Sequence, residues 1–123
     1  MSDYTIVAAQ EMKNITASGA TILDVRRQDE HDEQHLLAPH AFVTLDVLNP
    51  DDFMLRHGLD REAPVYILCR GGVRARTAAD MFAKAGYKNL YVIEGGILAC
   101  AAAGEPVSSG GASSRPSSAG GCA

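Results

Sequence analysis

The sequence has no tryptophan, few aromatic residues and only three cysteines, so it lacks the signals of several specialised protein classes. An odd number of cysteines in a short chain argues against a secreted disulfide framework and indicates at least one thiol outside any disulfide. Cys69, Cys100 and Cys122 form neither a CxxC pair nor a Cys/His cluster at zinc-binding spacing. We therefore expect no metal and no cofactor.

Long apolar runs and an excess of positive charge are also missing. The longest apolar stretches, residues 65–69 and 97–103, are much shorter than the ~20 residues that a membrane-spanning helix needs. The net charge of -4 provides no cationic field to hold nucleic acid. The first residues lack the positive and apolar regions of a secretory signal. We expect a cytoplasmic protein. Its partners should be small molecules or proteins, and we expect it to bind neither nucleic acid nor a membrane.

The apolar content is sufficient for one ordinary domain. The chain of 123 residues is 46% hydrophobic and 21% charged, which is within the range of soluble globular proteins and fits a single core. The C-terminal end differs, because it is dominated by Ser, Gly, Ala and Pro with one charge at Arg115. This composition is typical of a linker. We predict a domain over residues 1–107 and a flexible tail over 108–123.

Short apolar segments alternate with helical ones along the chain. We predict strands over 21–25, 41–45, 64–68 and 90–93, and helices over 8–18, from 50 onward, 75–85 and 97–103, with one helical turn inside the polar segment 26–40. Buried strands that alternate with helices indicate an α/β fold. We expect a central, mostly parallel sheet of about five strands with helices on both faces.

One cysteine lies where a reactive thiol is expected. Cys69 directly follows the strongest strand signal and precedes Arg70, Gly71, Gly72, Val73 and Arg74, after which a helix is predicted. A strand, a glycine-containing loop and a helix form the geometry in which backbone N–H groups face an anion. Arg70 and Arg74 add positive charge that suits a dianion such as thiosulfate. The alternative, an inert buried cysteine, requires none of these neighbours.

Two motifs together resemble the rhodanese family. The loop Cys69-Arg70-Gly71-Gly72-Val73-Arg74-Ala75 is similar to that family's Cys-Arg-x-Gly-x-Arg-Ser. Asp24-Val25-Arg26, followed by Glu30 and His35-Leu36, is similar to its Asp-Val-Arg-x-x-x-Glu-Tyr-x-x-Gly-His-Ile. Residues 86–87, 92–96 and 104–107 are similar to its Gly-Tyr, Leu-Glu-Gly-Gly and Gly-x-Pro-Val segments. The resemblance covers about residues 4–107 and implies the rhodanese-like α/β fold.

The sequence departs from this family pattern at a few positions. His31 replaces the aromatic residue, Gln34 replaces the glycine, and residues 37–40 replace the usual Pro-Gly-Ala. Cys100 stands where the family commonly has a tryptophan. We expect a reshaped entrance loop and a weaker core wall, with the groups that the chemistry requires still present.

The resemblance implies a sulfurtransferase. The Cys69 thiolate would take the outer sulfur of thiosulfate or a small persulfide and pass it to cyanide, a thiol or a protein thiol. The backbone of residues 70–74 would bind the transferred sulfur, and Asp24, Arg26 and His35 would support the site structurally. Cys100 is expected in the core, and sulfur transfer to Cys122 is a secondary hypothesis. The other histidines, His31, His40 and His57, carry no functional signal.

Two other functions remain open from the residues. Phosphatases and arsenate reductases of the same fold class resemble Cys-x5-Arg, with arginine six positions after the cysteine. Here position 75 is alanine and the arginine is residue 74, which gives a smaller ring that suits a sulfur atom. A non-catalytic binding module is the third possibility, although such modules commonly lose the cysteine.

Overall fold

The computed structural model describes residues 4–71 and 73–108 and contains one parallel sheet. The elements are β1 (Thr5–Val7), η1 (Ala9–Glu11), α1 (Met12–Ala17), β2 (Thr21–Asp24), α2 (Gln28–Glu33), β3 (Ala41–Phe42), η2 (Leu45–Val47), α3 (Pro50–Arg56), β4 (Val65–Leu68), α4 (Val73–Lys84), β5 (Leu90–Ile93) and α5 (Gly96–Ala102). The strand order is β1-β5-β4-β2-β3, and every pair of neighbouring strands is parallel. The predicted α/β class and five-stranded sheet are confirmed.

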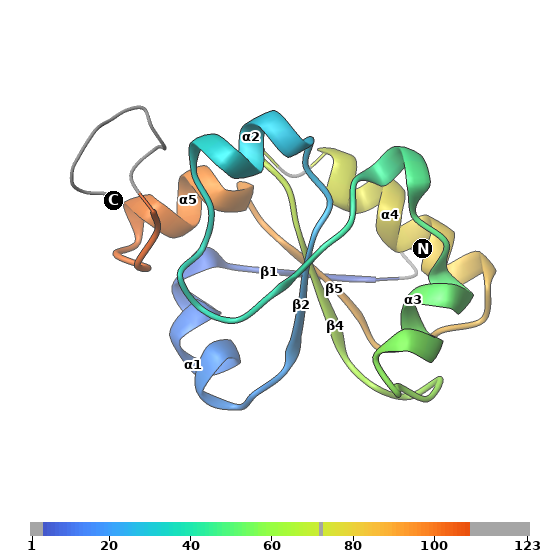
Figure 1. The fold of residues 1–123 in the computed structure, drawn as a ribbon. Helices are drawn as coiled ribbons and strands as arrows, with labels where there is room; N and C mark the ends of the chain where they lie inside the picture. The colour runs from blue at the N-terminus through green and yellow to red at the C-terminus, as the bar shows by residue number, and fades with distance from the viewer. Residues whose placement is uncertain (1–3, 72, 109–123) are drawn as a thin grey trace.

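Strand β4, in the middle of the sheet, packs against a core cluster on each face. Val65 and Ile67 pack in a cluster with residues of α3 and α4 such as Phe82. Leu68 packs in the second cluster with residues of α1 and α5 such as Met12. Side chains alternate between the two faces of a strand, so both faces of β4 are apolar. Figure 1 shows α1 and α5 on one side of the sheet and α3 and α4 on the other, as predicted.

The edges of the sheet differ from the predicted elements. Strand β1 was not predicted, because three residues are too few to show a period, and its register with β5 comes from pairing such as Val7 with Ile93. Strand β3 ends at Phe42 instead of extending to residue 45, since the chain turns into η2. The helix predicted over 8–18 is divided into η1 and α1.

The start of α3 and the burial of Cys100 agree with the predictions. Helix α3 begins at Pro50 as predicted, and the Asn49 side chain accepts a hydrogen bond from the Asp52 N–H at 3.0 Å. Cys100 on α5 is fully buried in the second core cluster, as expected. Burial raises the pKa of the Cys100 thiol to about 11, so this thiol stays protonated near neutral pH.

The end of the described chain is joined to the segment after α2. Leu36 and Val107 form an antiparallel bridge, and the Ser108 N–H donates to the His35 carbonyl at 2.8 Å. We expected the tail to start at residue 108, yet Ser108 is hydrogen-bonded to His35 of the domain. The rest of that tail, including Cys122, lies outside the described residues. Within residues 4–71 and 73–108, no helix has the length and apolar content needed to cross a membrane.

Candidate functional site

Cys69 lies at the carboxyl end of the central strand. It follows the last residue of β4 and is separated by three residues from Val73, where α4 begins. Cys69 is only 1% exposed, whereas Arg70, Gly71 and Val73 are exposed. Gly72 lies outside the described residues. The carboxyl edge of a parallel sheet is where ligands bind in open α/β folds, so the position of Cys69 suits a reacting group.

The turn before α5 packs directly against the backbone of the Cys69 loop. The Ile97 N–H donates to the Cys69 carbonyl at 2.8 Å. Gly96 has a φ of +59°, and a Cβ on it would lie 2.1 Å from the Cys69 carbonyl oxygen and 2.4 Å from that of Arg70. Only glycine allows this approach. The sequence indicated the Gly95-Gly96 pair only as part of a family motif, and the contact of Gly96 with the loop was not predicted.

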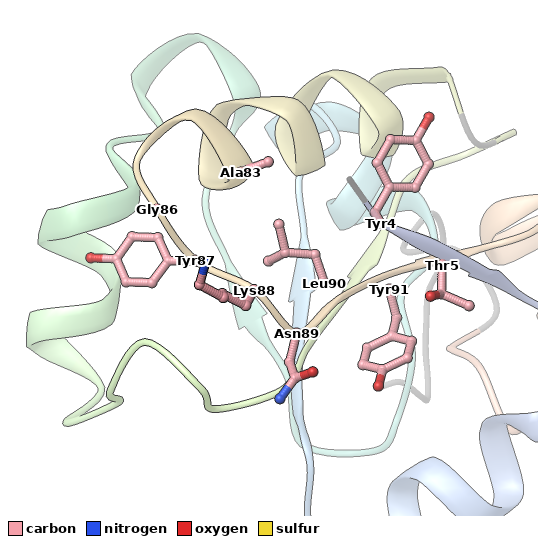
Figure 2. Close-up of a pocket in the computed structure, with 9 residues that line it drawn as sticks. All are labelled: Tyr4, Thr5, Ala83, Gly86, Tyr87, Lys88, Asn89, Leu90 and Tyr91. Atoms are coloured by element: carbon pink, nitrogen blue, oxygen red, sulfur yellow. The ribbon is translucent and has the colours of Figure 1, made fainter. Parts of the chain in front are cut away.

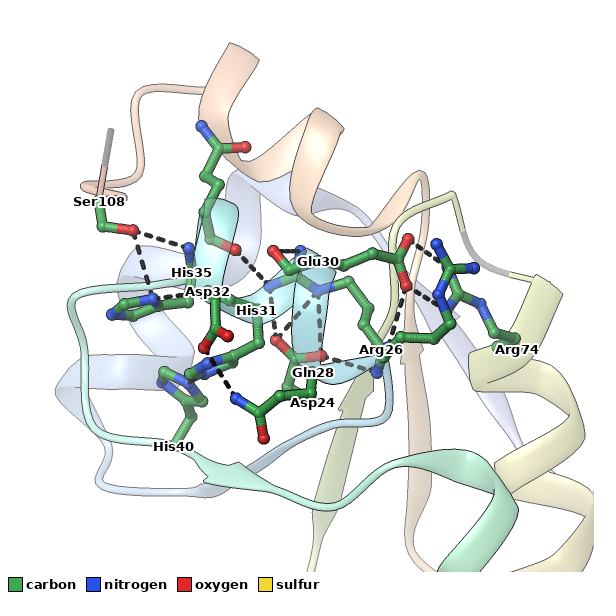
Figure 3. Close-up of polar contacts among 12 residues, drawn as sticks. Asp24, Arg26, Gln28, Glu30, His31, Asp32, His35, His40, Arg74 and Ser108 are labelled. Carbon is green, nitrogen blue, oxygen red and sulfur yellow. Dashed lines mark hydrogen bonds and ion pairs between the residues drawn. The ribbon is translucent and has the colours of Figure 1, made fainter. Parts of the chain in front are cut away.

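Arg74 forms a two-point ion pair with Glu30 of α2 (Figure 3). Its Nη2 donates to Glu30 Oε2 at 2.9 Å, and its Nη1 donates to the other carboxylate oxygen. The pair lowers the pKa of Glu30 to about 2. It also raises the pKa of Arg74, and the electrostatic interaction with Cys69 acts in the same direction. Arg74 therefore lies in the electrostatic environment of Cys69, but its guanidinium group is already bound to a carboxylate.

A buried ion pair holds the end of β2. The Arg26 guanidinium donates to both carboxylate oxygens of Asp24, with Nη2 at 2.9 Å from Oδ2, and the two residues are 2% and 0% exposed. The same guanidinium donates to the carbonyl of Glu30 within α2 and to the carbonyl of Gln34, the residue that follows the helix. The Asp24–Arg26 pair thus holds α2 against the end of β2 through charge-assisted hydrogen bonds. This is the structural role that the sequence led us to expect.

The contacts of His35 join three parts of the chain. Its backbone N–H donates to the Ser108 hydroxyl at 2.9 Å, and its Nδ1 lies 2.9 Å from the His31 carbonyl. Its ring stacks on the His31 ring with centroids 4.5 Å apart. These contacts support the structure around His35.

His31 and His40 were given no role in the sequence analysis, and the fold brings them together. Their Nε2 atoms are 2.9 Å apart, and the His31 ring also stacks on Phe42 at 4.2 Å. Burial lowers the pKa of His31. Both histidines stand in the segment that departs from the rhodanese pattern, and that departure was the available signal. Their proximity depends on the loop between α2 and β3.

A cavity of about 490 Å³ adjoins Arg74. It is lined by residues from the ends of β2 and α2, from η2 and from α4: Val25, Arg27, Gln28, Thr44, Leu45, Asp46 and Arg74. A second cavity of about 400 Å³, between Tyr4 and Tyr91, is shown in Figure 2. It includes Leu90, the first residue of β5, and so lies at the opposite edge of the sheet from Cys69. The first cavity is the better candidate for substrate approach.

Comparison with known protein families shows which family the chain belongs to. The family described as Rhodanese-like domain matches residues 8–103. The chain belongs to the rhodanese-like family. The match includes both the loop after β4 and the segment from Asp24 to His35. The resemblance stated from these two motifs is therefore confirmed, and the rhodanese-like domain accounts for most of the chain.

Several curated proteins are similar to this rhodanese-like domain over part or most of its length. Thiosulfate sulfurtransferase GlpE of Pseudomonas fluorescens is 27% identical over 97 residues, which cover 78% of this chain and 84% of that protein. The GlpE protein of Pseudomonas entomophila is 29% identical over the same length and coverage. A tRNA uridine(34) hydroxylase of Prochlorococcus marinus is 41% identical over 49 residues, but these cover 39% of this chain and 16% of that protein.

Solved structures support the fold. A rhodanese-like domain from Anabaena has a TM-score of 0.72 at 23% identity, covering 92% of this chain and 85% of that one. A rhodanese-like domain protein from Staphylococcus aureus has a TM-score of 0.64 at 23% identity, covering 78% of this chain and 90% of that one. At such identities the likeness concerns the fold alone, and it agrees with the observed parallel sheet.

Proposed function

We propose that this rhodanese-like domain is a sulfurtransferase that carries sulfur as a Cys69 persulfide. The observation that carries the proposal is the position of Cys69 between the central strand and the first turn of α4, with Arg74 in its electrostatic environment. The distant relationship to proteins named thiosulfate sulfurtransferase supports the same reaction class. Thiosulfate is the proposed donor, and a small persulfide is the other candidate.

The first step transfers sulfur to the enzyme. The Cys69 thiolate attacks the outer sulfur of thiosulfate, a new S–S bond forms, and the S–S bond of thiosulfate breaks. Sulfite leaves with the electron pair of that bond, so the step needs no external oxidant or reductant. Backbone N–H groups at the start of a helix favour negative charge, and we propose that residues 70–74 stabilise the bound sulfur in this way.

The second step returns the thiolate. An acceptor such as cyanide or a thiolate attacks the outer sulfur of the Cys69 persulfide, forms its own bond to that sulfur, and displaces the Cys69 thiolate. The products are thiocyanate or a new persulfide. The cavity beside Arg74 is open enough for a small acceptor, and a protein thiol carried on an exposed segment is a further acceptor class.

Arginine placement favours sulfur transfer over the phosphatase alternative. Position 75 is a fully buried alanine that packs in the core of the sheet and α4. Arg74 lies five positions after Cys69, one position closer than the arginine of Cys-x5-Arg, and it is paired with Glu30. A side chain at position 75 points into the core, so it would have no access to an anion at the loop.

Mass spectrometry of the intact protein tests the proposal. The full chain is incubated with thiosulfate, and sulfite release is followed in parallel for the wild type, Cys69→Ser and Cys122→Ser. We expect a gain of one sulfur atom and a stoichiometric release of sulfite in the wild type and in Cys122→Ser. Both signals disappear in Cys69→Ser. Circular dichroism confirms that each variant keeps its fold.

Two outcomes would overturn parts of this account. If neither thiosulfate nor a small persulfide adds sulfur to the wild type, the domain is not a sulfur carrier, and the non-catalytic binding module becomes the favoured function. If sulfur is added but transfer to every acceptor is unchanged in Cys122→Ser, the hypothesis that Cys122 accepts sulfur is removed.

A further inference from the structure

The histidines after β2 form a cluster with a carboxylate. One ligand atom from each of Asp24, His31 and His40 lies within 4.8 Å of the others. Asp24 comes from the end of β2, His31 from α2, and His40 from the loop before β3. Asp24 is buried, whereas the two histidines are half-buried, so solvent reaches the cluster from the histidine side (Figure 3). Side chains from three segments converge here, at the carboxyl end of β2.

Hydrogen bonding fixes the tautomer of His40. Its Nδ1 lies 2.8 Å from the Ala38 carbonyl, which can only accept a hydrogen bond. Nδ1 therefore carries the proton, and in the neutral ring Nε2 offers a lone pair. The His31 Nε2, 2.9 Å away, supplies the proton of the bond between the rings. A carbonyl bond to the far nitrogen of a histidine is the arrangement that orients metal ligands in proteins.

Stacking fixes the orientation of His31. Its ring is nearly parallel to the His35 ring, at 8° and 4.5 Å, and also stacks on Phe42 at 25° and 4.2 Å. These contacts limit rotation of the imidazole. The His31 Nε2 is therefore held toward His40 before any ligand binds, which reduces the entropy lost on binding.

We propose that His31 and His40, with Asp24 beside them, bind a divalent transition-metal ion of the zinc type. The ion takes the position of the proton shared between the two rings, and that proton moves to Nδ1 of His31. Zinc–nitrogen bonds of about 2.0–2.1 Å require the two nitrogens to separate to roughly 3.3 Å in a tetrahedral site. The rings therefore separate by only a few tenths of an ångström, a movement that the loop carrying His40 can make.

The donor atoms decide the class of metal. Two imidazoles favour zinc, copper or nickel, whereas magnesium and calcium prefer sites made only of oxygen ligands. Asp24 already accepts hydrogen bonds from Arg26 on both oxygens. Its carboxylate thus contributes one remaining lone pair or a water-mediated bond and balances the charge of the ion. Water completes the coordination.

Zinc titration of the full chain tests the proposal. Cys69→Ser and Cys122→Ser are introduced as a background, because thiolates would compete for zinc, and binding is measured by competition with a chromogenic chelator. We expect one equivalent of zinc to bind. His31→Asn and His40→Asn should each weaken binding at least tenfold. His57→Asn is the matched control, since His57 packs on Phe53 outside the cluster, and it should leave the affinity unchanged.

A second measurement avoids dependence on the variants. Imidazole nitrogen resonances of the full chain, in the same background, are recorded before and after one equivalent of zinc. The Nε2 resonances of His31 and His40 should move while those of His57 stay in place. Absence of zinc binding, binding that survives both substitutions, or resonances of His31 and His40 that do not move would each overturn the proposal. None of these results depends on sulfur transfer.

Discussion

Arg74 of α4 and Glu30 of α2 are joined by two parallel hydrogen bonds, so the helix that follows Cys69 is connected to the helix that follows β2. The Arg74 side chain is 29% exposed and that of Glu30 is 12% exposed. The pair places a carboxylate next to the arginine that the sequence assigned to substrate binding. Glu30 thus both holds Arg74 in place and reduces the positive charge available to an anionic donor.

Removing the Glu30 charge should strengthen donor binding. In Glu30→Gln, the Arg74 charge is no longer neutralised, and attraction for a dianion increases. We expect the KM for thiosulfate to fall about threefold to tenfold, which corresponds to roughly 1 kcal/mol of added attraction at a partly exposed site. Steady-state kinetics measures the change. Glu33→Gln, an exposed position on the same helix, is the control for net charge. A higher KM in Glu30→Gln would mean that the carboxylate acts mainly by positioning Arg74.

The same ion pair should give a pH dependence of stability. The pKa of Glu30 is about 2 in the folded protein and 4.5 in the unfolded chain, where the ion pair is broken. The folded state therefore binds fewer protons between these two pH values. Stability from Glu30 is therefore fully present above pH 4.5 and is lost as the pH falls toward 2. Urea unfolding of the wild type and Glu30→Gln across this range measures the effect. The difference between the two proteins should shrink as the pH falls, and a constant difference would contradict the assignment.

Breaking the buried Asp24–Arg26 pair should strongly destabilise the domain. Arg26→Met leaves the Asp24 carboxylate buried without its partner, and we expect a loss of about 3–5 kcal/mol in the free energy of unfolding. Arg27→Met is the matched control, because Arg27 forms an ion pair with Asp29 that is exposed to solvent, and exposed ion pairs contribute little to stability. Denaturant unfolding compares the two. The double variant Asp24→Asn/Arg26→Met should lose less than the sum of the single changes, and additivity would argue against direct coupling.

Gly96→Ala should disturb the Cys69 loop. The new methyl group would lie 2.1 Å from the Cys69 carbonyl oxygen, in addition to the unfavourable positive φ. Gly104→Ala is the control, since Gly104 also has a positive φ but no atom within 4 Å of the added carbon. Left-handed backbone alone costs about 1–2 kcal/mol, and overpacking adds about 1–3 kcal/mol.

We therefore expect Gly96→Ala to lose more stability than Gly104→Ala and to lower kcat/KM for sulfur transfer more than tenfold. Thermal unfolding and steady-state kinetics measure the two effects. Equal losses of stability in both variants would show that the loop adapts to the methyl group.

Local pattern predicted the central elements because their signals are contained in a few adjacent residues. The apolar run at 64–68 indicated β4, and proline with acidic residues after Asn49 indicated the start of α3. The strands at the edges of the sheet were harder to predict. Strand β1 has three residues, and its pairing with β5 depends on a partner more than eighty positions away.

For the candidate site, the sequence predicted a reacting group, which stays a prediction, but it did not predict the contacts around that group. Cys69 was identified from the strand before it and the glycines and arginines after it. Arg74 was expected to face substrate, but in the structure it is paired with Glu30, forty-four positions earlier. The proximity of His31 and His40 was missed for a similar reason, since it depends on how the loop between α2 and β3 folds back.

The sequence by itself determined the family, the α/β class and the identity of the candidate nucleophile, because each depends on short motifs and on local periodicity. Only the tertiary structure decided what surrounds them: the Gly96 contact beneath the Cys69 loop, the carboxylate bound to Arg74, and the histidine cluster beside Asp24. These depend on side chains from distant segments that meet at one edge of the sheet. Their distances follow from packing of the whole chain, which no local pattern encodes.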